Sequence, residues 1–72
     1  MIKPVGKSDN KVLIDIGDDL LVAVELTSGD VSPPINKYSY IAHNPYWTKV
    51  SKKEAELAIN LYDLYKKMEG HL

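Results

Sequence analysis

Aromatic and lysine side chains that could hold a ligand are concentrated in one short segment of the chain. Four of the six aromatic residues lie between Asn36 and Lys49. Aromatic rings can stack on nucleotide bases while lysines balance phosphate charge, and Tyr and Trp also dominate protein interfaces. A structural role stays open beside these two, in which some rings simply cover the core beneath a helix. The residues that we expect to bind a partner or ligand, including two lysines just downstream, are Tyr38, Tyr40, His43, Asn44, Tyr46, Trp47, Lys49, Lys52 and Lys53.

The groups that most catalytic sites require are scarce in this chain. His43 and His71 are the only histidines and lie far apart in the sequence, whereas a metal site needs three or four converging ligands and a serine nucleophile needs a base and an orienting acid. The acidic run from Asp15 to Asp19 lacks the ligand ladder and closing glutamate of a calcium-binding EF-hand loop. Acids beside a glycine are commonly turn formers. We therefore expect no catalytic residues, no metal site, no cofactor and no enzymatic activity.

Composition narrows the classes of partner and the cellular setting. The formal net charge is −1, with an acidic N-terminal part (six acids against three lysines in residues 1–30) and a mildly basic remainder. The chain has no arginine, the side chain best suited to recognising phosphate and guanine, so strong nucleic-acid binding is disfavoured. No apolar run is long enough for a signal peptide or a membrane span, and there is no cysteine to indicate an oxidising compartment. These features favour a cytoplasmic protein without membrane association.

An alternation of apolar side chains over residues 11–27 is typical of two strands. A three-residue hairpin loop at residues 17–19 would set Lys11 opposite Glu25, a favourable cross-strand pair. The same register puts one set of apolar side chains on a single face, namely Val12, Ile14, Ile16, Leu20, Val22 and Val24. The reverse face carries Leu13, Leu21 and Ala23 among charged residues. We expect that face to be half covered or to expose an apolar surface that associates with another chain.

Turns alternate with extended segments in the rest of the chain before residue 51. Residues 28–34 are rich in Ser, Gly and Pro and predict a loop, and residues 37–42 predict a third strand. Residues 46–50 are interpreted as a short fourth strand, with an extended loop as the alternative. Residues 1–10 show no comparable pattern and are interpreted as an N-terminal segment that can be flexible.

A long helix is predicted at the C-terminal end, over residues 51–69. Ser51 and Glu54 have the spacing of a capping box, and Gly70 is placed to end the helix. Its apolar surface is wider than a helix lying on one sheet needs. The main stripe contains Leu57, Ala58, Leu61, Leu64, Tyr65 and Met68, and it is widened by Ala55, Ile59 and Tyr62. We expect Ile59 and Tyr62, together with Leu13 and Leu21, to take part in self-association.

These features predict one α+β domain over residues 1–72, with a small antiparallel sheet of three to four strands that begins with a hairpin and one C-terminal helix packed on it. A chain of this length buries only about 60% of its unfolded surface, and oligomerisation is a usual reinforcement without disulfides, so we expect a homodimer or another homo-oligomer. The expected function is non-catalytic, the regulation or inhibition of another macromolecule through a protein interface. By association, such small domains include inhibitors that phages and mobile elements direct against host enzymes or defence systems. The alternative is an oligomer that binds or sequesters a nucleotide-like ligand.

Overall fold

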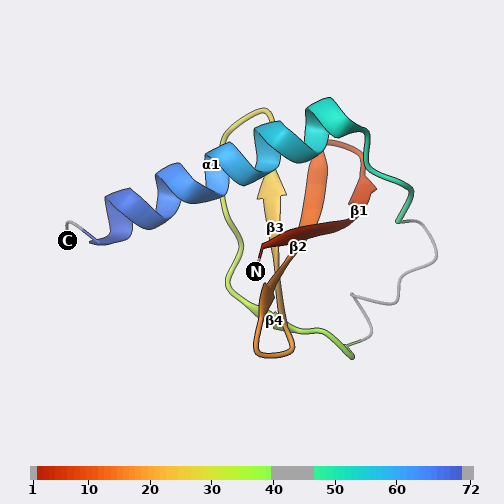
Figure 1. Ribbon diagram of the computed structural model, residues 1–72, viewed down its shortest axis with the longest axis horizontal. Coiled ribbons are helices and arrows are strands. Elements are labelled where there is room, and N and C mark those ends of the chain that lie inside the picture. Colours follow the sequence, from red (N-terminus) through yellow and green to blue (C-terminus); the bar gives the residue numbers. More distant parts are fainter. Residues whose placement is uncertain (1, 40–46, 71–72) are drawn as a thin grey trace.

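The computed structural model describes residues 2–39 and 47–70, which form one antiparallel sheet with a helix above it (Figure 1). The strands follow one another in the sheet as they do in the chain. They are β1 (Lys3–Ser8), β2 (Lys11–Gly17), β3 (Leu20–Glu25) and β4 (Ile35–Asn36), and helix α1 spans Lys52–Gly70. The predicted α+β class with an early hairpin and one C-terminal helix is confirmed. Within the described residues, no helix combines the length and the apolar character that crossing a membrane requires.

The β2–β3 hairpin has the predicted register along most of its length. Ile14 pairs with Val22, and Lys11 pairs with Glu25. Residues that pair across two antiparallel strands share a face of the sheet. Because the register is as predicted, the apolar side chains of the two strands lie on one face of the hairpin.

At the hairpin tip the prediction of a three-residue loop is wrong. Gly17 pairs with Leu20, and the register shifts between Asp15 and Gly17. Asp18 and Asp19 both have positive φ, 56° and 60°, which is the backbone of a two-residue turn matched to strand twist. The shift is a β-bulge, and it places one extra residue in β2 before that turn.

Asp15 stabilises this bulge and connects it to the segment after β4. The N–H of Gly17 donates to Oδ1 of Asp15 at 2.9 Å, and Nζ of Lys37 lies 3.4 Å from Oδ2. The hydrogen bond from Gly17, with a smaller contribution from Lys37, lowers the pKa of Asp15. The carboxylate therefore stays charged where the chain needs an acceptor for the bulge.

Residues 3–8 form an edge strand, so the interpretation of residues 1–10 as a flexible segment is wrong. β1 pairs with β2 along its length, and the two strands are joined by a tight turn in which Asp9 has a φ of 53°. The register shifts between Pro4 and Gly6, and prolines and bulges are characteristic of sheet edges. Because lysines, a proline and a glycine replace alternating apolar residues, the local pattern does not indicate a strand.

The third strand lies earlier than predicted. Residues 37–39 form a turn, and the strand is instead the short β4, which pairs with the beginning of β3. The side-chain oxygen of Asn36 accepts a hydrogen bond from the N–H of Tyr38 at 2.8 Å. Such a side-chain turn competes with the strand ladder and ends it. Residues 40–42 of the predicted strand lie outside the described residues.

The main core lies between the sheet and α1. Ala58 and Tyr62 pack from the helix onto buried side chains of the sheet, and Ile59 packs against the same cluster. Tyr62 is only 7% exposed. Tyr62 is therefore used inside the fold rather than on a surface for self-association, whereas the same prediction for the partly buried Ile59 stays a prediction. The sheet residues of this core are Val12, Ile14, Val22 and Val24.

The reverse face of the hairpin is covered as well. Leu13 and Leu21 are 1% and 2% exposed, so the prediction that they are available for self-association is also wrong. Gly6 pairs with Leu13, and a Cβ atom added to Gly6 would lie 3.1 Å from Cβ of Trp47. Trp47 therefore lies over β1 on the same face of the sheet as Leu13, so a segment distant in sequence reaches this face.

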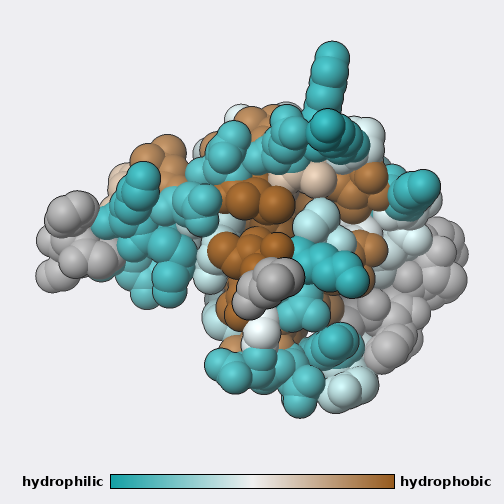
Figure 2. Space-filling view, in the orientation of Figure 1, coloured by the Kyte–Doolittle hydropathy of each residue, from teal (hydrophilic) through white to brown (hydrophobic). Residues whose placement is uncertain are grey.

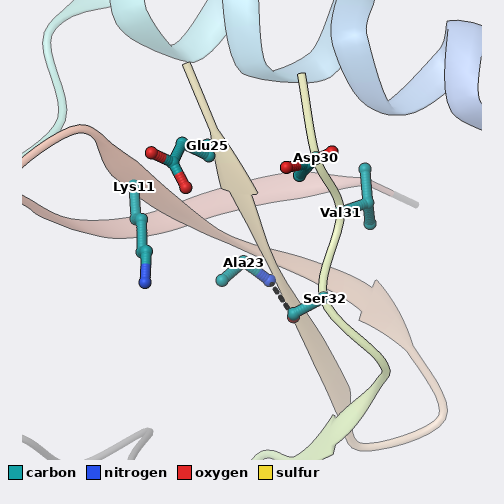
Figure 3. Close-up of a pocket in the computed structure, with 6 residues that line it drawn as sticks. All are labelled: Lys11, Ala23, Glu25, Asp30, Val31 and Ser32. Atoms are coloured by element: carbon teal, nitrogen blue, oxygen red, sulfur yellow. Dashed lines mark hydrogen bonds between the residues drawn. The ribbon is translucent and has the colours of Figure 1, made fainter. Parts of the chain in front are cut away.

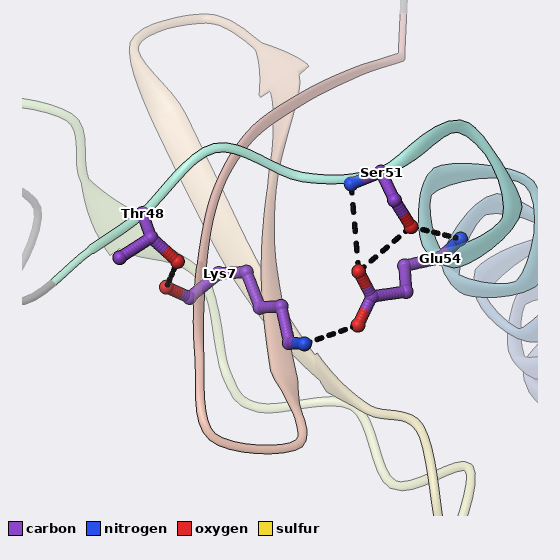
Figure 4. A network of polar contacts seen from close by, with 4 residues as sticks. All are labelled: Lys7, Thr48, Ser51 and Glu54. Carbon is purple, nitrogen blue, oxygen red and sulfur yellow. Dashed lines mark hydrogen bonds and ion pairs between the residues drawn. The ribbon is translucent and has the colours of Figure 1, made fainter.

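Helix α1 begins at the predicted capping box (Figure 4). Oγ of Ser51 accepts from the N–H of Glu54 at 3.2 Å, while the Glu54 carboxylate accepts from the N–H and Oγ of Ser51 at 3.4 and 2.7 Å. Lys7 of β1 forms an ion pair with the same carboxylate. Lys7, followed by Ser51, lowers the pKa of Glu54. One side chain thus caps the helix and connects it to the edge strand.

Acid is expected to weaken this connection. Because the pKa of Glu54 is lower in the folded chain than its ordinary value of 4.5, the carboxylate contributes stability above that value and loses it as the pH falls through the folded pKa. Urea denaturation of the wild type and of Glu54→Gln, from neutral to strongly acidic pH, measures the difference. The wild type should be more stable at neutral pH, and the two curves should converge in acid. A difference that stays constant with pH would contradict this role.

Candidate functional site

Trp47 is positioned by the residue that follows it and by a glycine. The N–H of Thr48 donates to the carbonyl of Lys7 at 2.7 Å, and the N–H of Lys7 donates to the carbonyl of Thr48 at 2.8 Å. This bridge is isolated, so residues 47–50 follow the extended-loop alternative and the short fourth strand predicted there is wrong. Trp47 itself is half-buried and packs on Gly6, where an added Cβ would make a tight contact of 3.1 Å with it and push it by a few tenths of an ångström.

The indole forms one wall of a hollow of about 400 Å³ beside the paired ends of β2 and β3. A smaller hollow of about 170 Å³ adjoins it and shares Lys11 and Glu25 (Figure 3). We call the two hollows together the Trp47 groove. Its lining residues are Ser8, Asp9, Asn10, Lys11, Ala23, Glu25, Asp30, Val31, Ser32 and Trp47.

The wall of the smaller hollow is held in place along the edge of β3. Ser32 exchanges two hydrogen bonds with Ala23, one from its N–H to the carbonyl (2.9 Å) and one to its Oγ from the Ala23 N–H (2.8 Å). The N–H of Glu25 donates to the carbonyl of Asp30 at 2.8 Å. These contacts use backbone groups that an open sheet edge would leave unsatisfied. The groove is therefore bounded by ordered backbone on both sides.

Charges of both signs line the groove without neutralising one another. Lys11 and Glu25 pair in the predicted register, yet the lysine side chain extends away from the carboxylate in Figure 3. The ion pairs formed within residues 2–39 and 47–70 join other residues. Glu25 accepts a hydrogen bond of 3.3 Å from the Thr27 hydroxyl. An ammonium group and carboxylates can thus meet charged groups of an incoming molecule.

The structure brings together only part of the predicted set. Trp47 lies in the groove, whereas Tyr38 is exposed in the turn after β4, and three lysines are exposed just before and at the start of α1. Those lysines are Lys49, Lys52 and Lys53. The remaining predicted residues, Tyr40, His43, Asn44 and Tyr46, lie outside the described residues.

Sequence reasoning missed the charged residues opposite Trp47. The hairpin register could place Lys11 beside Glu25, but nothing in the local pattern shows that Trp47 would lie against them. A contact between segments so far apart in the chain depends on how residues 28–50 return across the sheet. One local signal could have indicated this end of the groove. It is the turn at Asp9, because Asp and Asn commonly form the two-residue turns that join hairpin strands.

The Trp47 groove offers groups suited to recognising a peptide or a small polar molecule. It combines an indole ring, an ammonium group, carboxylates and side-chain hydroxyl and amide groups. Among the described residues, no group of three or more His, Cys, Asp or Glu side chains could hold a metal ion. Comparison of the chain with models of known protein families, with curated proteins and with solved structures found no match. Its function is therefore inferred from its own surfaces.

Proposed function

We propose that this chain is a non-catalytic binding domain that regulates or inhibits another protein, and that the Trp47 groove holds a segment of that partner. The supporting observation is the placement of Trp47, a large aromatic side chain held by a backbone bridge and by Gly6 at the side of a groove. A few rigid aromatic anchors supply most of the binding energy at protein interfaces. A side chain that is already positioned loses little entropy on binding.

The charges of the groove support a peptide as the ligand. Lys11 and Glu25 line both hollows of the groove, and Asp30 lines the smaller one. A partner segment with an aromatic or apolar residue between charges of opposite sign would complement this arrangement. Such complementarity sets the orientation and specificity of a bound segment more than its affinity.

Selection from a random peptide display library tests this function and identifies the segment that the groove prefers. We expect peptides to be enriched on the wild-type chain and to quench or shift the fluorescence of Trp47, the single tryptophan. Replacing a central aromatic anchor by alanine costs at least about 2 kcal/mol, so Trp47→Ala should weaken the selected peptides by roughly 30-fold or more.

Two further variants separate loss of the anchor from a general effect. Gly6→Ala keeps the indole but displaces it, because the new Cβ would approach Cβ of Trp47 to 3.1 Å, and it should also weaken binding. Leu64→Ala lies on exposed helix surface and should bind as the wild type does. Failure to enrich any peptide, or peptides that bind Trp47→Ala equally well, would contradict the proposal.

A nucleotide-like ligand is the second candidate, and the size of the hollow favours it. About 400 Å³ falls within the range of small-molecule sites, and Trp47 could stack on a base while Lys11 meets a phosphate. Titration with a panel of nucleotides should then quench the Trp47 fluorescence at saturating concentration. No response to the panel, combined with a response to selected peptides, would contradict the nucleotide-like ligand and leave protein binding as the proposed function.

A further inference from the structure

The outer side of α1 carries an apolar surface that the sheet does not cover. The C-terminal half of the helix extends beyond the sheet (Figure 1), and every side chain described from residue 63 to residue 69 is exposed. Leu64 and Met68 are 54% and 63% exposed. Figure 2 shows apolar side chains along the edge of the helix that points away from the sheet. Leu64 and Met68 do not line the Trp47 groove, although the hollow beside them shares Asp30 and Val31 with it.

The spacing of these residues is that of a coiled-coil seam. Leu57, Leu61, Leu64 and Met68 follow one another at steps of four, three and four residues, which places them at alternating d and a positions of two heptads. The residues that face the sheet, such as Ala58 and Tyr62, fall at other positions of the same heptads. The helix therefore has one apolar side for its own sheet and one with the period of helix pairing, and the two meet at Leu61, which also packs against the core cluster.

We propose that the occupant of this seam is the α1 helix of a second copy of the chain, packed antiparallel about a two-fold axis. The seam is symmetric about its midpoint between Leu61 and Leu64. Antiparallel pairing sets each Leu57 against Met68 of the other copy and each Leu61 against the other Leu64, so that all four positions are filled. A closed two-fold contact of this kind uses the same surface on both copies.

Electrostatics favours the same orientation. Two neighbouring helices that run antiparallel place the positive end of one macrodipole beside the negative end of the other. Glu56 and Lys67 are both exposed, and in these heptads they lie on the same side of the helix, Lys67 at a g position beside the seam and Glu56 at a c position farther from it. Groups on the same side approach one another in an antiparallel pair, so Glu56 of one copy attracts Lys67 of the other at longer range. A second copy thus supplies both the apolar and the charged complement.

A second helix can reach the seam, whereas the core is closed to it. Leu61 is half-buried because it packs against the edge of the core cluster and because the loop that contains Gly29 approaches it, with 3.5 Å between a Cβ added at Gly29 and Cδ2 of Leu61. This loop and the helix border a hollow of about 390 Å³ lined by Leu61, Leu64, Tyr65 and Met68. The loop fills one side of the seam and leaves the other side open to a second helix.

Sedimentation velocity of the whole chain, from micromolar to millimolar concentration, tests the dimer. The wild type should pass from its monomer mass of 8.1 kDa to twice that mass. Leu64→Glu places a charge in the seam and should weaken the dimer by more than about 100-fold. Tyr38→Glu, an equally charged change at an exposed position outside the seam, should associate as the wild type does, and circular dichroism checks that both variants fold.

Engineered cysteines test the orientation, because the natural chain has none. After oxidation of a mixture of Leu57→Cys and Met68→Cys chains, mass spectrometry should find mainly the mixed disulfide, since antiparallel pairing brings these two positions together. A wild type that stays monomeric at all concentrations, or a dimer unaffected by Leu64→Glu, would overturn the proposal. A predominance of the two homodisulfides would overturn the antiparallel arrangement. None of these outcomes depends on whether the Trp47 groove binds a peptide.

Discussion

Replacing Tyr62 by alanine is expected to destabilise the fold by about 3–5 kcal/mol, the usual loss when a large buried aromatic side chain is removed. Tyr62 is almost fully buried between α1 and the sheet and is the largest helix residue in the core cluster. A domain of this size has a total stability of only about 4–10 kcal/mol. Urea denaturation followed by circular dichroism should show the midpoint falling sharply, with a large unfolded fraction already present without urea.

Tyr65→Ala is the matched control for that measurement. The two rings are stacked with centroids 6.4 Å apart and planes inclined by 29°, but Tyr65 is exposed. A stacked pair contributes about 0.5–1.5 kcal/mol beyond burial, so this variant should lose no more than about that amount. Its hydroxyl also hydrogen-bonds with Glu69, which raises the pKa of Tyr65. Equal losses in the two variants would contradict the assignment of Tyr62 to the core and Tyr65 to the surface.

Ile14→Ala is expected to cost about 2–5 kcal/mol, because it removes a fully buried side chain from the centre of the sheet and leaves a cavity. Ile14 pairs with Val22 on β3 and lies opposite Pro4 on β1, so three strands meet at this position. The free energy of unfolding from urea denaturation measures the effect.

Val5→Ala provides the comparison for Ile14, since Val5 is an exposed apolar residue on the neighbouring strand. Exposed substitutions of this type change stability by about 0.5 kcal/mol or less. A loss at Val5 comparable to that at Ile14 would mean that the outer face of β1 is covered. A small loss at Ile14 would contradict the position of the core beneath α1.

The predicted hairpin and helix illustrate what local patterns can determine. The alternation of apolar residues on either side of Gly17 admits one register that puts them on a single face, and that register is observed from Lys11 to Asp15, with a shift only at the tip. Ser51 and Glu54 supply the reciprocal hydrogen bonds of a helix start within four residues of one another. In both cases the interacting groups are close in sequence, so the pattern contains nearly all of the information that decides the structure.

The edge strand β1 and the short β4 are elements that local sequence patterns do not predict. β1 contains a proline, a glycine and two lysines and is a strand only because β2 offers it a partner. β4 ends where Asn36 bonds to the backbone two residues on, an alternative that competes with the strand ladder over the length of a single turn. Where the local preferences are this small, the neighbouring segment decides which structure forms.

The sequence by itself determined the class of the fold, the hairpin register up to its tip, the bounds of the helix to within one residue and the excess of apolar surface on that helix. Only the tertiary structure decided which apolar side of α1 faces the sheet. Ala58 allows a close approach and Tyr62 fills the space beside it, so the leucine seam is left outside. It also decided that Trp47 packs on Gly6 and lines one hollow together with Lys11 and Glu25. These outcomes depend on packing between residues that are distant in the chain. The free energy of that packing depends on the shape and burial of several segments together, so the sequence of a single segment does not reveal it.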